Sequence, residues 1–307
     1  MENESLLTAC SLCPRECSVN RIEGRRGYCK EDGTIAIARA ALHMWEEPCI
    51  SGDRGSGTVF FSGCPMGCVF CQNREIASGA VGKKITISRL VEIFLELQEK
   101  GAANINLVTP THFVVPIVEA LHTAKRRGLS IPVVYNSSGY ERVSTLQLLD
   151  GLVDIYLPDF KYMDDTLAGR YSKAKGYSSY AKEAIKEMVR QVGGPEFLDD
   201  GMMKKGVIVR HLVLPGCEED SKQIVKYLYE TYGDNIFISI MNQFTPLDGL
   251  EGYPEINRVL SEEEYDRIVD YAIELGVENG FIQEGETAKE SFIPSFDYEG
   301  VDPASNR

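Results

Sequence analysis

The sequence lacks long apolar runs, and no stretch of about eighteen apolar residues could cross a bilayer. Basic residues are also few: 32 Lys and Arg stand against 46 Asp and Glu, a net charge of −14. This charge is poorly suited to gripping a phosphate backbone, which argues against nucleic acid as a partner. The acidic start contains no basic segment followed by an apolar one, as an export signal would. We therefore expect a cytoplasmic protein with no membrane partner.

Three common catalytic motifs are missing as well. The sequence contains no Gly-x-Ser-x-Gly elbow, no phosphate loop ending in Gly-Lys-Ser/Thr and no His-Glu-x-x-His helix. These absences exclude the hydrolases and nucleotide-binding proteins that depend on such motifs.

The sequence does contain nine cysteines, and in a reducing compartment we interpret them as metal ligands and free thiols rather than disulfides. Cys64, Cys68 and Cys71 form the pattern Cys-x3-Cys-x2-Cys on a loop after an apolar run. Each iron of a cubane cluster takes one thiolate, and no fourth cysteine follows closely. One iron would therefore keep an open position, as working metal sites do. A zinc loop or an electron-transfer ferredoxin loop is the alternative.

A second group of cysteines falls within twenty residues of the N-terminal part of the chain. We expect residues 1–55 to be a cysteine-rich segment, formed by loops that a metal rather than a core holds together. Four soft ligands suit tetrahedral zinc or a fully ligated second iron–sulfur cluster, and the alternative is four unliganded thiols. The candidate ligands are Cys10, Cys13, Cys17 and Cys29.

From residue 57 onward, apolar runs of strand length alternate with longer stretches of helical period. This alternation predicts an α/β fold, and six repeats suit a partial (β/α)6 TIM-like barrel over residues 56–284, followed by a tail, residues 285–307. The expected strands are 57–63, 104–109, 131–136, 153–158, 206–213 and 236–241. The expected helices are 88–100, 114–127, 142–150, 179–192, 219–232 and 261–275. Catalytic groups gather at the carboxyl ends of such strands, and all six predicted ends are polar.

The three-cysteine loop, with Phe70 before its last cysteine and Gln72 after it, resembles that of radical S-adenosylmethionine (SAM) enzymes. The resemblance is greatest to the pyruvate formate-lyase activating enzyme and its uncharacterised homologues. It implies that Cys64, Cys68 and Cys71 hold a [4Fe-4S] cluster whose fourth iron binds SAM. Reductive cleavage of SAM would then give a 5′-deoxyadenosyl radical that abstracts hydrogen from the substrate.

The resemblance also implies site residues at the strand ends. Lys161 and Arg210 would be catalytic, facing SAM or substrate. At the second strand, Thr109 and Thr111 stand where the activating enzyme has Gly-Gly-Glu, so threonine oxygens replace a carboxylate as acceptors for the SAM amino group. Turn and helix-capping chemistry is the other interpretation of these threonines. The implied cofactor-binding residues are Phe70, Gln72, Thr109, Thr111, Asn136, Ser137, Asp159, Lys161, Arg210 and Gln243.

These features together predict an oxygen-sensitive radical SAM oxidoreductase, active under anaerobic conditions and similar to the glycyl-radical activating enzymes. The resemblance implies a protein or peptide substrate and an electron donor of the flavodoxin or ferredoxin type. The alternative of another class is a non-catalytic iron–sulfur or zinc protein that transfers electrons or binds a partner. An open iron would respond spectroscopically to SAM, whereas closed clusters would not.

Overall fold

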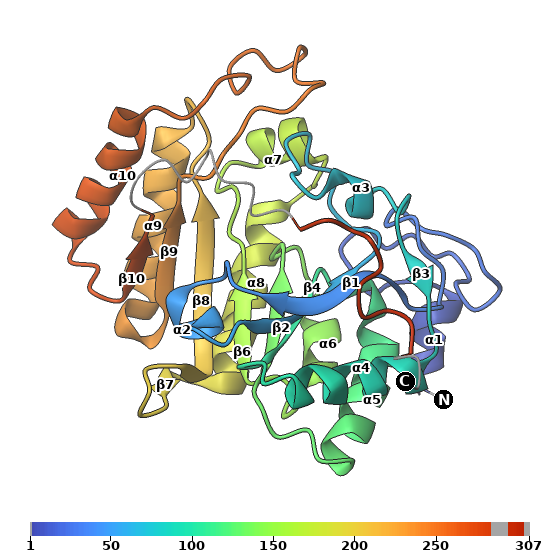
Figure 1. Ribbon diagram of the computed structural model, residues 1–307. Helices are drawn as coiled ribbons and strands as arrows, with labels where there is room; N and C mark the ends of the chain where they lie inside the picture. Colours follow the sequence, from blue (N-terminus) through green and yellow to red (C-terminus); the bar gives the residue numbers. More distant parts are fainter. Residues whose placement is uncertain (1, 284–293, 304–307) are drawn as a thin grey trace.

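The computed structural model describes residues 2–283 and 294–303. Its sheet runs in the order β10-β9-β8-β6-β5-β4-β2-β1-β3, and the strands from β2 to β10 in this path are parallel. The α/β architecture and the six predicted strands are confirmed, and helices cover the outer face of the curved sheet (Figure 1). The six strands are β2 (Ser56–Phe61), β4 (Ile105–Val108), β5 (Val133–Ser137), β6 (Ile155–Pro158), β8 (Met203–Leu212) and β9 (Phe237–Met241).

The six predicted helical segments are present, each after its strand. Side-chain caps fix where two of these helices begin. The Thr86 side chain accepts a hydrogen bond from Arg89 N ahead of α4, and Ser261 and Glu264 form a capping box at α10. The segments are α4 (Ile87–Glu99), α5 (Val114–Arg126), α6 (Val143–Leu146) with the 3₁₀ turn Gln147–Leu149, α8 (Tyr177–Val192), α9 (Glu218–Tyr232) and α10 (Glu262–Leu275).

Several short elements were not predicted from the sequence. A seventh parallel strand, β10, extends the sheet beyond β9, and α7 follows β6. The short elements that were not predicted are α1 (Glu2–Thr8), α2 (Pro48–Ser51), α3 (Arg74–Ala77), α7 (Asp165–Ser172), β3 (Lys83–Lys84), β7 (Glu196–Phe197), β10 (Gly280–Ile282) and the 3₁₀ turns Thr111–Phe113 and Gly233–Asn235.

The expectation that residues 1–55 are loop throughout is wrong for their second half. β1 (Ala36–His43) pairs antiparallel with β2, and most of its side chains are buried. The apolar run of residues 35–41 therefore belongs to the core rather than to a metal-held loop. Residues 9–35 contain no regular helix or strand, so the loop part of the expectation is confirmed for them, whereas α1 is helical.

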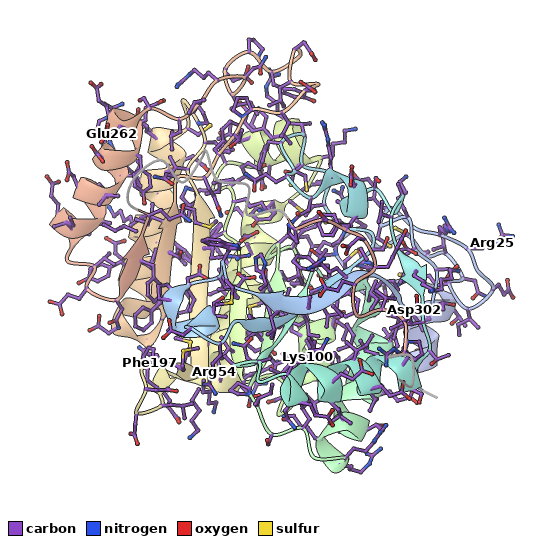
Figure 2. The ribbon with its side chains drawn as sticks, viewed as in Figure 1. Arg25, Arg54, Lys100, Phe197, Glu262 and Asp302 are labelled. Atoms are coloured by element: carbon purple, nitrogen blue, oxygen red, sulfur yellow. The ribbon has the colours of Figure 1, made fainter. Side chains whose placement is uncertain are left out.

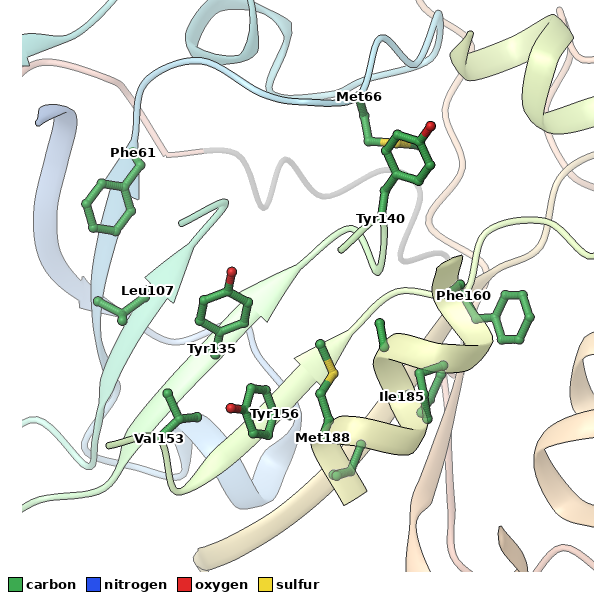
Figure 3. Close-up of a cluster of buried hydrophobic side chains, with 14 of the residues drawn as sticks. Phe61, Met66, Leu107, Tyr135, Tyr140, Val153, Tyr156, Phe160, Ile185 and Met188 are labelled. Carbon is green, nitrogen blue, oxygen red and sulfur yellow. The ribbon is translucent and has the colours of Figure 1, made fainter. Parts of the chain in front are cut away.

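Alternation along the strands builds two apolar layers. Leu107, Tyr135 and Tyr156 point outward from β4, β5 and β6, and Tyr156 lies near Met188 of α8 (Figure 3). Inward residues of β5, β6 and β8 fill the lower barrel together with Cys49 of α2. The next inward positions nearer the carboxyl ends are polar, and they form the site described below.

The described part of the C-terminal tail packs along β1. Ala38 O accepts from Tyr298 N (3.1 Å), and Ala40 N donates to Glu299 O (2.8 Å). Residues 284–293 and 304–307, which include most of the predicted tail and its predicted start, lie outside the described residues. Charged side chains such as Glu262 and Asp302 project from the surface (Figure 2). Within the described ranges, no helix is both long and apolar enough to span a bilayer.

Candidate active site

A cavity of about 250 Å³ opens at the carboxyl ends of the parallel strands. Most of the residues that the sequence suggested for the site line it, although they come from distant parts of the chain. The predicted residues that line the cavity are Cys64, Cys68, Phe70, Cys71, Gln72, Thr109, Asn136, Ser137, Asp159, Lys161, Arg210 and Gln243.

The three-cysteine loop leaves β2 through Gly63, which has a positive φ of 81°. Val69 N donates to Tyr171 O (2.8 Å), and the Ser172 hydroxyl donates to Cys68 Sγ (2.9 Å), so α7 anchors the middle of the loop. Phe70 packs edge-on against Phe244 at 5.8 Å between ring centroids. The loop is thus held from two sides with its sulfur atoms at the cavity.

The chemistry of these thiols fits an iron–sulfur cluster. All three are free, and burial, with a smaller contribution from Cys68, raises the pKa of Cys71 to about 12. Without a metal the thiol would therefore stay protonated, whereas a coordinating thiol is deprotonated outright. Among the described residues, no three His, Cys, Asp or Glu side chains converge closely enough for a single metal ion. Cubane clusters instead distribute their ligands over separate irons.

A network of charged side chains forms another wall of the cavity. Lys161 Nζ donates to Asp159 Oδ2 (2.7 Å), and Arg210 Nε donates to Asp159 Oδ1 (3.1 Å). Arg210 also donates to Glu46 Oε2 (3.1 Å) and to Asn136 Oδ1 (2.6 Å). A buried guanidinium needs a carboxylate partner, and Arg210 has two, Asp159 and Glu46. Because β8 alternates, Arg210 points into the barrel.

Charges in this network decide which groups are ionised. Burial opposes ionisation of Asp159, but Lys161 and Arg210 outweigh it and hold the pKa of Asp159 below its ordinary value. Burial likewise opposes the cation of Lys161, and Asp159 overcomes this and raises the pKa of Lys161. Burial raises the pKa of Glu46, with Arg210 opposing. The cavity therefore presents a Lys161 ammonium beside the thiols, a group able to pair with an anionic ligand.

The two threonines after β4 have different positions. Thr109 lines the cavity with a φ of 60°, and its N–H donates to Asn136 O (2.9 Å). A β-branched residue with positive φ is a genuine outlier. The expectation for Thr111 is not met: this residue is fully buried, and its hydroxyl donates to Glu141 Oε1 (2.5 Å). The 3₁₀ turn that begins at Thr111 directs it away from the cavity.

The lining residues that the sequence interpretation missed include His43, Trp45 and Glu46. They lie at the end of β1 and directly after it, where the antiparallel pairing of β1 with β2 lets Glu46 reach Arg210 and Asn136. Glu46 receives a hydrogen bond from Asn106 Nδ2 (2.8 Å) as well as from Arg210. The one sequence feature that could have pointed to Glu46 is Arg210, because a guanidinium in an apolar run needs a carboxylate partner. Nothing in the sequence, however, identifies Glu46 as that partner.

His211, next to Arg210, faces the opposite side of β8. Its Nδ1 lies 2.8 Å from Phe160 O, and its Nε2 lies 2.8 Å from Ser221 Oγ. Burial lowers the pKa of His211 to about 4, so the ring is neutral at physiological pH. This histidine is a packed, hydrogen-bonded residue outside the cavity, as its alternation predicts.

The partial barrel and the three-cysteine loop at its polar mouth define a radical SAM protein. Residues 58–228, more than half of the chain, match the sequence model of the Radical SAM superfamily, and the chain belongs to this superfamily. Over 281 residues it is 30% identical to "Uncharacterized protein MJ0674" of Methanocaldococcus jannaschii, covering 88% of this chain and 75% of that protein.

Solved structures share the fold. Methylornithine synthase (PylB) aligns with a TM-score of 0.50 and 16% identity over 83% of this chain and 77% of that one. SuiB of Streptococcus suis, bound to S-adenosylmethionine, aligns with a TM-score of 0.50 and 14% identity over 76% of this chain. The chain covers 51% of SuiB, about half its length. At these identities the likeness shows the fold alone.

Proposed function

We propose that this chain is a radical SAM enzyme that abstracts hydrogen from a protein or peptide substrate. The observation that carries the proposal is the single cavity shared by the thiols of Cys64, Cys68 and Cys71 and the charged side chains of Lys161, Asp159 and Arg210. Soft ligands for iron and polar groups for a zwitterionic cofactor thus lie together, as a SAM site needs. Membership of the superfamily makes this the chemistry to test first.

The residues present suit the two cofactors. Cys64, Cys68 and Cys71 would hold a [4Fe-4S] cluster and leave one iron for SAM. When bound, the cluster and SAM supply a 5′-deoxyadenosyl radical, and the protein supplies orientation and exclusion of competing reactions. An external one-electron donor of the flavodoxin or ferredoxin type completes the requirement.

The chain's own groups have distinct tasks in this proposal. Lys161 offers an ammonium to the SAM carboxylate, and Asp159 keeps that lysine charged despite its burial. Thr109 offers hydroxyl and carbonyl oxygens to the SAM ammonium, a role that the Gly-Gly-Glu of the activating enzyme would otherwise fill. Arg210, tied to Asp159 and Glu46, fixes the wall against which the cofactor would rest.

The proposed substrate class rests on the rim of the cavity. Trp45 lines the cavity and is 58% exposed, and a large exposed aromatic side chain is typical of surfaces that bind other polypeptides. A peptide segment, such as the glycine-containing loop that glycyl-radical activating enzymes modify, suits this rim.

The proposal is tested by anaerobic reconstitution with iron and sulfide, reduction, and chromatographic assay for 5′-deoxyadenosine. Wild-type protein should produce it from SAM, and Cys68→Ala should lower the rate to background. Cys217→Ala is the matched control, because Cys217 is a partly exposed thiol that lies away from the cavity, and it should retain the rate. A loaded, reduced protein that leaves SAM intact would disprove the proposal.

A spectroscopic arm separates this function from a non-catalytic electron carrier. The electron paramagnetic resonance signal of the reduced cluster should change when SAM is added, because one iron is open. An unchanged signal in protein with full iron content would favour the carrier.

A further inference from the structure

A second group of thiols gathers in the loops of residues 9–35, which lie beside α3 and β3 (Figure 1). Cys10, Cys13 and Cys29 are buried, and Cys17 is partly exposed. Cys13 interacts electrostatically with Cys10 and Cys29, and Cys29 interacts with Cys10 and Cys17. None of the four is in a disulfide. The four thiols therefore lie in one group, and four thiolates, one on each iron, are the ligand set of a closed [4Fe-4S] cluster.

The backbone is drawn closely around one of these sulfur atoms. Tyr28 N donates to Cys17 Sγ (3.2 Å), and a Cβ built at Gly27 would lie 3.1 Å from the same atom. The backbone of Gly27 and Tyr28 therefore packs directly against the Cys17 sulfur atom.

A buried cation lies beside the group. Arg21 is only 1% exposed, and it donates hydrogen bonds to two neutral carbonyl oxygens, His112 O and Asp32 O (2.5 Å for the latter). Its Nε has no hydrogen-bond partner among the described residues. The positive charge of Arg21 acts on Cys29. A buried guanidinium is costly unless an anion compensates it, and four neutral thiols supply none.

We propose that Cys10, Cys13, Cys17 and Cys29 bind a closed iron–sulfur cluster, a second metal centre whose negative charge is balanced by Arg21. Four thiolates around a doubly charged metal centre leave a net negative charge at this place. The centre accounts for the unpartnered Nε and for the burial of an arginine without a carboxylate on its hydrogen bonds.

The same loops touch the three-cysteine loop at three points. Arg15 Nε donates to Pro65 O (2.8 Å). A Cβ at Gly67 would collide with the Tyr28 hydroxyl, and one at Gly63 would collide with Cys29 O. A metal that fixes residues 9–35 therefore also fixes the loop that carries Cys64, Cys68 and Cys71, so the second centre clamps the first.

The metal is tested in a variant in which Cys64, Cys68 and Cys71 are all replaced by alanine, so the result does not depend on SAM chemistry. Anaerobically purified, reconstituted protein is measured for zinc, iron and sulfide. Stoichiometric iron with matching sulfide supports the cluster. Folded protein that contains zinc instead, or neither metal, overturns it.

The role of Arg21 is tested in the same background. Arg21→Met should release the metal to a chelator at least about tenfold faster, since groups around metal ligands typically contribute 10–100-fold to affinity. Arg25→Met is the matched control, because Arg25 projects from the outer tip of the same loops (Figure 2). Equal release from the two variants would overturn the charge-balancing role.

The clamp predicts a further signal besides metal content. Removing the metal from the triple-alanine variant should speed amide hydrogen exchange in residues 63–71, because the Pro65, Gly67 and Gly63 contacts loosen. Exchange in α10, on the far side of the barrel, serves as the internal reference and should stay unchanged. Unaltered exchange in residues 63–71 would overturn the clamp.

Discussion

Arg210 Nε lies 3.1 Å from Asp159 Oδ1, joining the carboxyl ends of β8 and β6 across the barrel mouth. Both side chains are largely buried, and Lys161 occupies the other oxygen of Asp159. The three charges therefore form one unit, in which Lys161 and Arg210 hold Asp159 ionised and Asp159 holds Lys161 ionised. Loss of the Asp159 carboxylate would leave the buried cations of Lys161 and Arg210 with less negative charge beside them.

Asp159→Asn should lower the free energy of unfolding by about 3 kcal/mol, because it breaks a buried pair on one side only. Denaturant unfolding followed by circular dichroism measures this. Asp150→Asn is the control, since the Asp150–Arg190 pair is exposed and should contribute under about 1 kcal/mol. Equal losses in the two variants would mean that burial adds nothing to the Asp159 pairs.

Thr109→Gly should stabilise the protein while weakening SAM binding. A positive φ costs a β-branched residue about 1–2 kcal/mol, which exceeds the extra chain entropy of glycine, so a gain of about 1 kcal/mol is expected. Thr109→Ala keeps a Cβ at that φ and should show no such gain, although it also loses the hydroxyl. Thermal unfolding and SAM titration of both variants separate strain from ligand contact. A gain in the alanine variant would contradict the strain argument.

Glu141 should make stability fall as pH rises. Burial raises its pKa to about 7, against hydrogen bonds from Thr111, Ser137 and Tyr135 that lower it. A raised folded-state pKa means that the folded protein binds the proton more tightly, so the stabilisation is complete below about pH 4.5 and is lost toward pH 7. The loss over this range is about 3 kcal/mol at 1.36 kcal/mol per pKa unit.

Urea unfolding at several pH values measures this loss, and Glu141→Gln should remove it. Glu119→Gln changes an exposed carboxyl on α5 and should keep the wild-type pH profile. A Glu141→Gln variant with the wild-type profile would assign the dependence to another group.

Trp45 should report SAM binding directly. It is the one tryptophan of the sequence, 58% exposed, and it lines the cavity. SAM that covers the indole should shift its emission to shorter wavelength in a saturable way, measured by anaerobic fluorescence titration. Cys68→Ala, which removes one expected cluster ligand, should abolish the saturable change. A titration identical to wild type in that variant would place SAM elsewhere.

Most of the barrel could be predicted because its strands carry local signals. The strand at 131–136, for example, is an apolar run that ends in polar residues, and the helix at 88–100 has a clear period. Parallel strands then bring their ends together, so Asn136, Asp159 and Arg210 could be expected at one mouth. β10 has only three residues and carries too short a pattern to be recognised.

The parts that could not be predicted depend on long-range pairing or on local turn geometry. Glu46 reaches Arg210 only because β1 adds antiparallel to β2, a contact that no nearby motif encodes. Thr111 is two residues from Thr109, yet a 3₁₀ turn begins there and points it toward Glu141. A strand end thus predicts which segment reaches the site but not which side chain within it.

The contact of the tail with β1 also has a consequence for solubility. Beyond the short β3 pair, the outer edge of β1 forms backbone hydrogen bonds at Ala38 and Ala40 with Tyr298 and Glu299. An uncovered strand edge is a template for pairing with another copy. In a chain that ended before this contact, the backbone N–H and C=O groups at the outer edge of β1 would be free to pair with a strand of another copy. The tail therefore protects this edge from self-association.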